Sequence, residues 1–165
     1  MRHSPLVAFL LVAVAASAFA QPPRAKITPI VEAQSVAPGA RTRLALEVSL
    51  PPKLHTQSDK PRDPLLIPTV LTVDPLPALR VSNLIYPHPQ DFTLEGQNEP
   101  LLVFEHEFVV GAEIEVAASA TPGELVIPGR FRYQACDDKV CFQPRTERFE
   151  WGCALRQERL FPSRR

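Results

Sequence analysis

The chain is poor in methionine and cysteine and carries no net charge, and each of these features argues against a class of function. Its 165 residues include three cysteines and a single methionine, Met1. A blue-copper site normally needs a methionine near its cysteine and histidine ligands, so none is expected here. Eighteen Lys and Arg balance 18 Asp and Glu, which gives no electrostatic reason to expect nucleic acid or an anionic membrane as partner.

Familiar catalytic and metal-binding motifs are also missing. No Gly-rich phosphate loop, Ser-His-Asp order or pair of catalytic carboxylates stands out. His55, His88 and His106 are widely spaced and lack the short spacing of zinc ligands. The segment 105–107, Glu-His-Glu, is expected on an alternating strand with a solvated face, where its side chains do not converge. We therefore expect no metal and no cofactor.

Beyond residue 20 the sequence has no apolar run that could cross a membrane. The apolar run at residues 6–16 follows a short basic start and precedes Ala18-Phe19-Ala20, the layout of a secretory signal peptide cleaved after Ala20. An uncleaved anchor is the alternative, but the run is shorter than the roughly 20 residues that a spanning helix needs. We expect a signal peptide at residues 1–20, one exported domain at 21–155 and a flexible tail at 156–165.

Proline, by contrast, is abundant, with 19 residues spread along the chain. Prolines stop helices and are tolerated at strand ends and edges, and no window predicts an amphipathic helix. Residues 41–50 alternate well, with Leu44, Leu46 and Val48 on one face. Strands are predicted at residues 27–31, 41–50, 66–73, 79–86, 101–110, 114–119, 124–133 and 146–151.

Many short strands with frequent turn signals are typical of an all-β domain. The length favours an immunoglobulin-like β-sandwich, and a small closed barrel is the alternative. The polar stretches at residues 56–63 and 87–100 are expected to be surface loops, which often carry function when a rigid scaffold holds them.

Two of the three cysteines, Cys136 and Cys141, bracket a charged loop of four residues. Three cysteines allow three single pairings, but strands flanking this loop would bring these two within disulfide distance, and export places them in an oxidising space. So short a loop gains little chain entropy from a crosslink. A structural staple and a working redox centre both remain open.

Cys153 is expected to be a buried free thiol; pairing with another chain, or exchange with the other two cysteines, is the alternative.

The charges around the pair bear on thiol reactivity. Asp137 and Asp138 follow Cys136 directly, and nearby negative charge disfavours a thiolate. Lys139, Arg132 and Arg145 could act in the opposite direction. We expect neither thiol to be strongly acidified, so that reaction depends on docking with a specific protein.

Residues 133–136, Tyr-Gln-Ala-Cys, and 140–144, Val-Cys-Phe-Gln-Pro, resemble the signature of the N-terminal periplasmic domain of the thiol:disulfide interchange protein DsbD. Weaker similarities at residues 51–55, 58–61, 66–69 and 85–87 follow in the family's order. The resemblance covers roughly residues 25–152. It implies a periplasmic immunoglobulin-like sandwich that carries a redox-active Cys136–Cys141 pair.

The resemblance also implies a mechanism and partners. Cys141 would form the mixed disulfide and Cys136 would resolve it, as in a protein-disulfide reductase. A thioredoxin-like domain or membrane reductase would donate electrons, and a disulfide isomerase or cytochrome c maturation protein would accept them. A cap loop within residues 90–100 would shield the pair, with Phe92 as the shielding aromatic; the alternative makes Phe92 an ordinary loop residue.

The sequence departs from the family pattern in several places. Leu54 stands where tryptophan is common and Gln143 where proline is common. The chain has neither a transmembrane bundle nor a Cys-x-x-Cys motif, so no stable membrane insertion is expected and a separate membrane reductase would be needed. The competing function is a non-catalytic, immunoglobulin-like binding module in which the same disulfide is structural.

Overall fold

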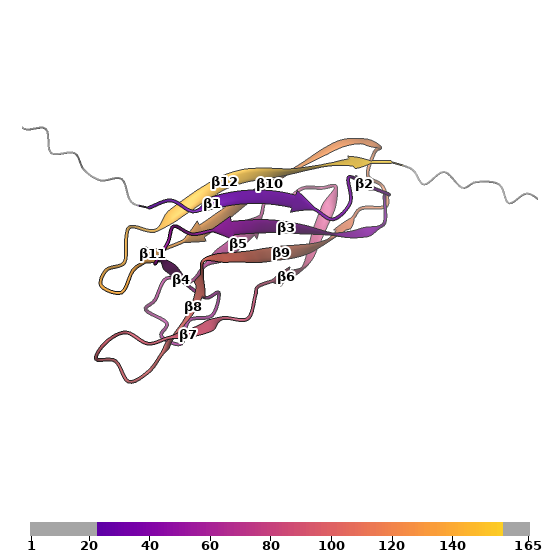
Figure 1. Cartoon of the computed structure of the whole chain (residues 1–165). Helices are drawn as coiled ribbons and strands as arrows, with labels where there is room; N and C mark the ends of the chain where they lie inside the picture. Colours follow the sequence, from indigo (N-terminus) through magenta and orange to yellow (C-terminus); the bar gives the residue numbers. More distant parts are fainter. Residues whose placement is uncertain (1–22, 157–165) are drawn as a thin grey trace, which may run out of the picture.

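The computed structural model describes residues 23–156, which form an all-β structure (Figure 1). Its strands make three four-stranded sheets. The first has the order β1 (Lys26–Val31), β3 (Arg41–Ser49), β9 (Glu107–Val116), β6 (Leu79–Ile85). The second has the order β2 (Ser35–Val36), β12 (Arg145–Leu155), β10 (Gly123–Tyr133), β5 (Val70–Val73). The third has the order β11 (Ala135–Cys136), β4 (His55–Gln57), β8 (Leu101–Glu105), β7 (Gln90–Phe92).

The first two sheets enclose the hydrophobic core and confirm the predicted sandwich. Alternate side chains of β3, including the predicted inward face of Leu44, Leu46 and Val48, are fully buried. They share one core with the buried side chains Phe131 and Trp151 of the second sheet. The Trp151 Nε1–H donates to the Ala45 carbonyl across the two sheets, at 2.7 Å. Apolar packing and a hydrogen bond thus join the inner faces of the first and second sheets.

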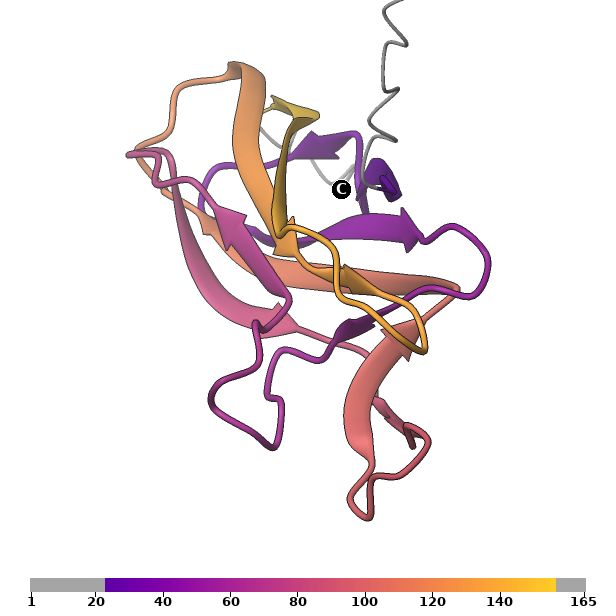
Figure 2. The ribbon, with the colours of Figure 1, turned by 90° about the vertical axis from the view of Figure 1, so that its left-hand side faces the viewer.

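The third sheet lies at one end of the sandwich (Figure 1). Figure 2 faces this end and shows the β7–β8 hairpin and the loop between β11 and β12 projecting from it. The chain passes from the third sheet into the first at His106, whose φ of 53° is left-handed. This residue divides the predicted strand 101–110 into β8 and the start of β9, and β9 also includes the first half of the predicted strand 114–119. The prediction of one alternating strand through residues 105–107 was therefore wrong.

The expectation that residues 56–63 form a surface loop was wrong at its start. Thr56 and Gln57 belong to β4 and Ser58 follows it, and all three are buried. The hydroxyls of Thr56 and Thr69 hydrogen-bond each other at 2.8 Å, and the Thr69 hydroxyl donates to the Gln57 carbonyl at 2.6 Å. Polar side chains that satisfy one another can be buried at little cost, which is why polarity did not signal exposure here.

Other boundaries differ more modestly from the prediction. The strand predicted at 66–73 is limited to β5, whereas the one predicted at 146–151 extends over all of β12. The short strands β2, β4, β7 and β11 were not predicted, and β7 interrupts the stretch 87–100 that was expected to be a loop. β2 pairs with β12 in parallel, while the other named pairs are antiparallel.

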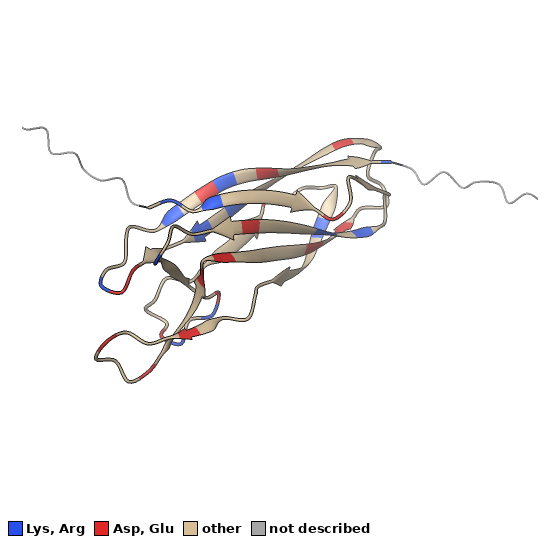
Figure 3. Ribbon diagram, in the orientation of Figure 1, with Lys and Arg blue, Asp and Glu red and all other residues tan. Residues whose placement is uncertain are grey.

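Charges of both signs are mixed over the strands (Figure 3). Several form ion pairs, such as Arg43 with Glu32 at 2.6 Å and Arg80 with Glu115 at 3.1 Å. Residues 23–156 contain no helix long and apolar enough to cross a membrane. The predicted signal peptide at 1–20 lies outside the described residues, as does the predicted tail beyond Arg156.

Candidate functional site

The structure joins Cys136 and Cys141 in a disulfide at the end that carries the third sheet. The Sγ atoms lie 2.01 Å apart and the Cα atoms 4.0 Å apart. Cys136 belongs to the edge strand β11 and is 1% exposed, whereas Cys141 is exposed at the end of the loop. Cys141 is therefore accessible to an approaching protein, whereas Cys136 is not.

Backbone hydrogen bonds shape the loop between the two cysteines. Asp137 Oδ1 accepts from the amides of Lys139 and Val140, each at 2.7 Å. The Asp137 amide donates to the Val140 carbonyl at 3.0 Å, and the Phe142 amide donates to the Ala135 carbonyl at 2.9 Å. The turn is thus closed by bonds other than the disulfide, so the disulfide adds little constraint of its own.

The carboxylate that organises this loop is charged at neutral pH. Its two backbone hydrogen bonds, from Val140 and then Lys139, lower the pKa of Asp137, and the positive charge of Lys139 acts in the same direction. This negative charge lies next to Cys136 in the chain and disfavours a thiolate there.

His55 lies beside Cys136 in the third sheet. The two residues are directly opposed in the β4–β11 ladder, and such pairs place their side chains on the same face with Cβ atoms about 4.5–5.5 Å apart. His55 is 2% exposed. Burial lowers the pKa of its imidazole, and the charges of Glu105 and Asp137 offset this only in part. The imidazole is therefore neutral at neutral pH.

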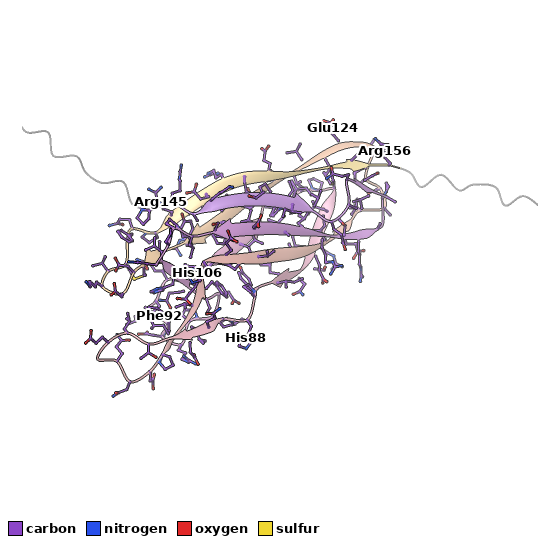
Figure 4. All side chains as sticks on the ribbon, viewed as in Figure 1. His88, Phe92, His106, Glu124, Arg145 and Arg156 are labelled. Atoms are coloured by element: carbon purple, nitrogen blue, oxygen red, sulfur yellow. A yellow bond between two sulfur atoms is a disulfide. The ribbon has the colours of Figure 1, made fainter. Side chains whose placement is uncertain are left out.

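Phe92 packs against the ring of this histidine. Its ring centroid lies 4.2 Å from that of His55, with the planes tilted by 38°. Phe92 ends β7, is half-buried, and pairs with Leu101 of β8. Figure 4 shows Phe92 in the same half of the molecule as Arg145, with Glu124 and Arg156 at the opposite end. Phe92 thus contacts the residue that is paired with Cys136 in the third sheet.

Arg62 ties the loop after β7 to the rest of this end. Its Nη2 donates to Asp91 Oδ1 at 2.8 Å, and its Nη1 donates to the Pro100 carbonyl. One guanidinium therefore contacts Asp91 and Pro100, near the two ends of the segment 90–100 that was predicted to contain a cap. Sequence reasoning missed Arg62, for which no local pattern exists, and considered His55 only as a weak metal ligand. The similarity at residues 51–55 was the signal that could have drawn attention to His55.

Cys153 is a free, buried cysteine of β12, as expected. Burial raises the pKa of its thiol. In the β10–β12 ladder it pairs with Leu125, near the end opposite to the Tyr133–Arg145 pair that adjoins the disulfide. Eight residues of strand separate Cys153 from Arg145, about 26 Å at roughly 3.3 Å per residue. The folded domain therefore keeps Cys153 away from the disulfide.

Among residues 23–156, no three His, Cys, Asp or Glu side chains gather closely enough to hold a metal ion. His88 is exposed, and its Nδ1 lies 2.9 Å from the Pro89 carbonyl. His106 is exposed at the junction of β8 and β9. Neither adjoins His55 in a strand pair.

The family model described as "Thiol:disulfide interchange protein DsbD, N-terminal" matches residues 24–151. No curated protein sequence matches the chain. The fold is similar to the N-terminal periplasmic domain of ScsB from Proteus mirabilis, with a TM-score of 0.48 and 18% identity.

That structural match covers 79% of this chain and 45% of the ScsB chain, so this protein spans less than half the length of that one. The residues matched by the family model include both cysteines of the disulfide, His55 and Phe92. Since it covers well over half of the sequence, the chain belongs to the family of N-terminal domains of the thiol:disulfide interchange protein DsbD.

Proposed function

We propose that this protein passes electrons between proteins by thiol–disulfide exchange at Cys136 and Cys141. The observation that carries the proposal is the unequal exposure of the two cysteines. Cys141 is exposed at the loop end, and Cys136 is 1% exposed on an edge strand. Family membership supports the same chemistry. A purely structural crosslink would add little stability here, because hydrogen bonds of Asp137 already close the turn.

The unequal exposure assigns a role to each sulfur. In the reduced protein, the Cys141 thiolate attacks a partner disulfide, and one partner sulfur leaves as a thiolate. The product is a mixed disulfide between Cys141 and the partner. Cys136 then attacks Cys141 Sγ, which re-forms the Cys136–Cys141 bond and releases the second partner thiol. Two electrons pass to the partner, and this domain is oxidised to the disulfide seen here.

The segment 90–100 acts as the cap that limits access to Cys136. Phe92 covers His55, which lies beside Cys136, and Arg62 holds the segment at Asp91 and Pro100. Movement of this segment would expose the buried cysteine when a partner docks. Val140, which precedes Cys141 and is 55% exposed, offers an apolar contact to that partner.

The partners are exported thiol-disulfide proteins. A thioredoxin-like domain or a membrane reductase supplies electrons, and a disulfide isomerase or a protein of cytochrome c maturation receives them. The setting is the periplasm, to which a signal peptide cleaved after Ala20 directs the protein. Because the charge of Asp137 disfavours a thiolate at Cys136, exchange depends on docking rather than on a highly reactive thiol.

A trapping experiment tests the assignment of roles. Cys136→Ser removes the resolving thiol, so Cys141 should accumulate mixed disulfides with its partners in an extract of exported proteins. Cys141→Ser is the matched control and should trap little, because its remaining thiol at position 136 is buried. Absence of any mixed disulfide with Cys136→Ser, or equal trapping by both variants, would contradict the proposal.

A further inference from the structure

Three side chains of different chemistry are aligned across the third sheet. The ladders pair Cys136 of β11 with His55 of β4, and His55 with Glu105 of β8. Directly opposed residues of antiparallel strands present their side chains on one face. The sheet therefore places a thiol-bearing residue, an imidazole and a carboxylate in one row, in that order.

The middle member of the row is poised to take a proton. His55 is buried, and burial lowers its pKa so that the imidazole is neutral at neutral pH. The groups that face it are Cys136 from β11, Asp137 from the adjoining loop, Glu105 from β8 and the uncharged ring of Phe92 from β7. Both carboxylates favour the charged imidazole, so they would stabilise it once it has gained a proton.

We propose that His55 is the proton acceptor for Cys136 when this thiol resolves a mixed disulfide, and that Glu105 stabilises the imidazolium so formed. This inference rests on the proposed exchange function. The Cys136 thiol transfers its proton to the imidazole as its sulfur attacks Cys141 Sγ. The Cys141–partner bond breaks, the partner leaves as a thiolate, and that thiolate or water then takes the proton from His55. In reduction of the disulfide the steps reverse: the attacking donor thiol gives its proton to His55, and the imidazolium passes it to the Cys136 sulfur as the Cys136–Cys141 bond breaks.

The proposed proton transfer matters because a free Cys136 thiolate is unfavourable at this site. Cys136 is buried beside a charged carboxylate, and both conditions oppose formation of a free thiolate. Removing the proton in the same step as the attack avoids that unfavourable intermediate. General bases placed in this way typically accelerate a reaction by about 10²–10⁴-fold. Cys141, which is exposed, needs no such help.

The test uses the full-length reduced protein and glutathione disulfide as the probe, so no protein partner is required. Rapid acid quenching and mass spectrometry follow two rates: formation of the Cys141–glutathione adduct, and its resolution by Cys136. His55→Gln should slow resolution on the order of 10²-fold near neutral pH. It should leave adduct formation at Cys141 unchanged when measured with Cys136→Ser. His88→Gln, at an exposed histidine, is the matched control and should change neither rate.

The pH profile separates proton transfer from a structural role. With His55 as acceptor, the resolution rate of the wild-type protein should not change with pH between the pKa of His55 and the pKa of the Cys136 thiol. The rate should decrease as the pH drops below the pKa of His55. In His55→Gln the rate should rise about tenfold per pH unit over the same range, as for an unassisted thiol. Glu105→Gln, at a half-buried residue, should slow resolution several-fold without affecting adduct formation.

Two outcomes would overturn the inference. One is a wild-type resolution rate that rises in proportion to hydroxide with no level region, which needs no variant and so does not depend on one folding. The other is a folded His55→Gln protein that resolves at the wild-type rate. Because glutathione replaces the partner, these outcomes are independent of whether Cys136→Ser traps any exported protein.

Discussion

Removing the ring of Phe92 should expose Cys136 selectively. In the reduced protein, alkylation of a thiol under a cap proceeds only from the open state, so its rate reports the open fraction. Phe92 is half-buried and packs against His55 in a tilted arrangement, with ring centroids 4.2 Å apart. Burial of about half its side chain contributes roughly 1 kcal/mol, and the aromatic contact contributes about 0.5–1.5 kcal/mol more. Phe92→Ala should therefore cost the closed state about 2 kcal/mol.

A loss of about 2 kcal/mol corresponds to a roughly 30-fold larger open fraction. Alkylation of Cys136 by iodoacetamide, resolved by mass spectrometry, should accelerate by up to that factor. The other two cysteines serve as references within the same molecule. Cys141 is already exposed and should react at its wild-type rate, while Cys153, buried near the opposite end, reports any general loosening.

Phe92→Leu is the matched variant, because it keeps apolar volume but removes the ring contact with His55. It should give a rate for Cys136 between those of the wild-type protein and Phe92→Ala. An unchanged rate in Phe92→Ala would contradict this prediction, since Phe92 would then not limit access to Cys136. Equal acceleration at Cys136 and Cys153 would refute it as well, because the fold rather than the cap would have opened.

Four further predictions concern the surroundings of the site and the core. Arg62→Gln should accelerate Cys136 alkylation only several-fold, and less at high salt, because an exposed ion pair is worth about 0.2–1 kcal/mol. Asp137→Asn keeps an acceptor for the loop but removes its charge, so thiol titration followed by alkylation should show a lower pKa for Cys136. Gly129→Ala should lower the free energy of unfolding in urea by about 1–3 kcal/mol, because the added Cβ would lie 2.7 Å from Trp151 Cζ3. Because the pKa of His55 is lowered in the folded protein, the unfolded chain protonates this imidazole more readily than the folded protein does. The stability that neutral His55 contributes is therefore complete above about pH 6.5 and is lost as the pH falls through the folded-state pKa. Urea unfolding between about pH 5 and 8 should show this loss, and His55→Gln should lack it.

Much of the sandwich could be predicted from local patterns. The alternation of residues 41–50 identified the buried face of β3, and the abundance of proline argued correctly against helices in the described part. The spacing of Cys136 and Cys141 on either side of a polar turn made their pairing plausible. These features are local, so a short window of sequence contains the physical information they need.

Other features depend on contacts between distant segments. β4 reads as polar, and its burial became clear only once Thr56 was found bonded to Thr69. The left-handed turn at His106 had no signal, because glycine is the usual residue for such a conformation. The pairing of His55 with Cys136 joins positions 81 residues apart, and no local pattern fixes that register. The candidate proton acceptor was therefore visible only in the sheet.

We propose that the Cys136–Cys141 bond is a working redox centre and not a purely structural crosslink. The reduction potential of this bond, measured by equilibration with a glutathione redox series and quantified by alkylation of the two thiols, distinguishes the two. Structural disulfides of exported proteins have potentials below about −300 mV. A working redox centre should have a potential above about −300 mV, within reach of exchange with partner dithiols. A value well below it would contradict the claim and leave the disulfide as a structural bond.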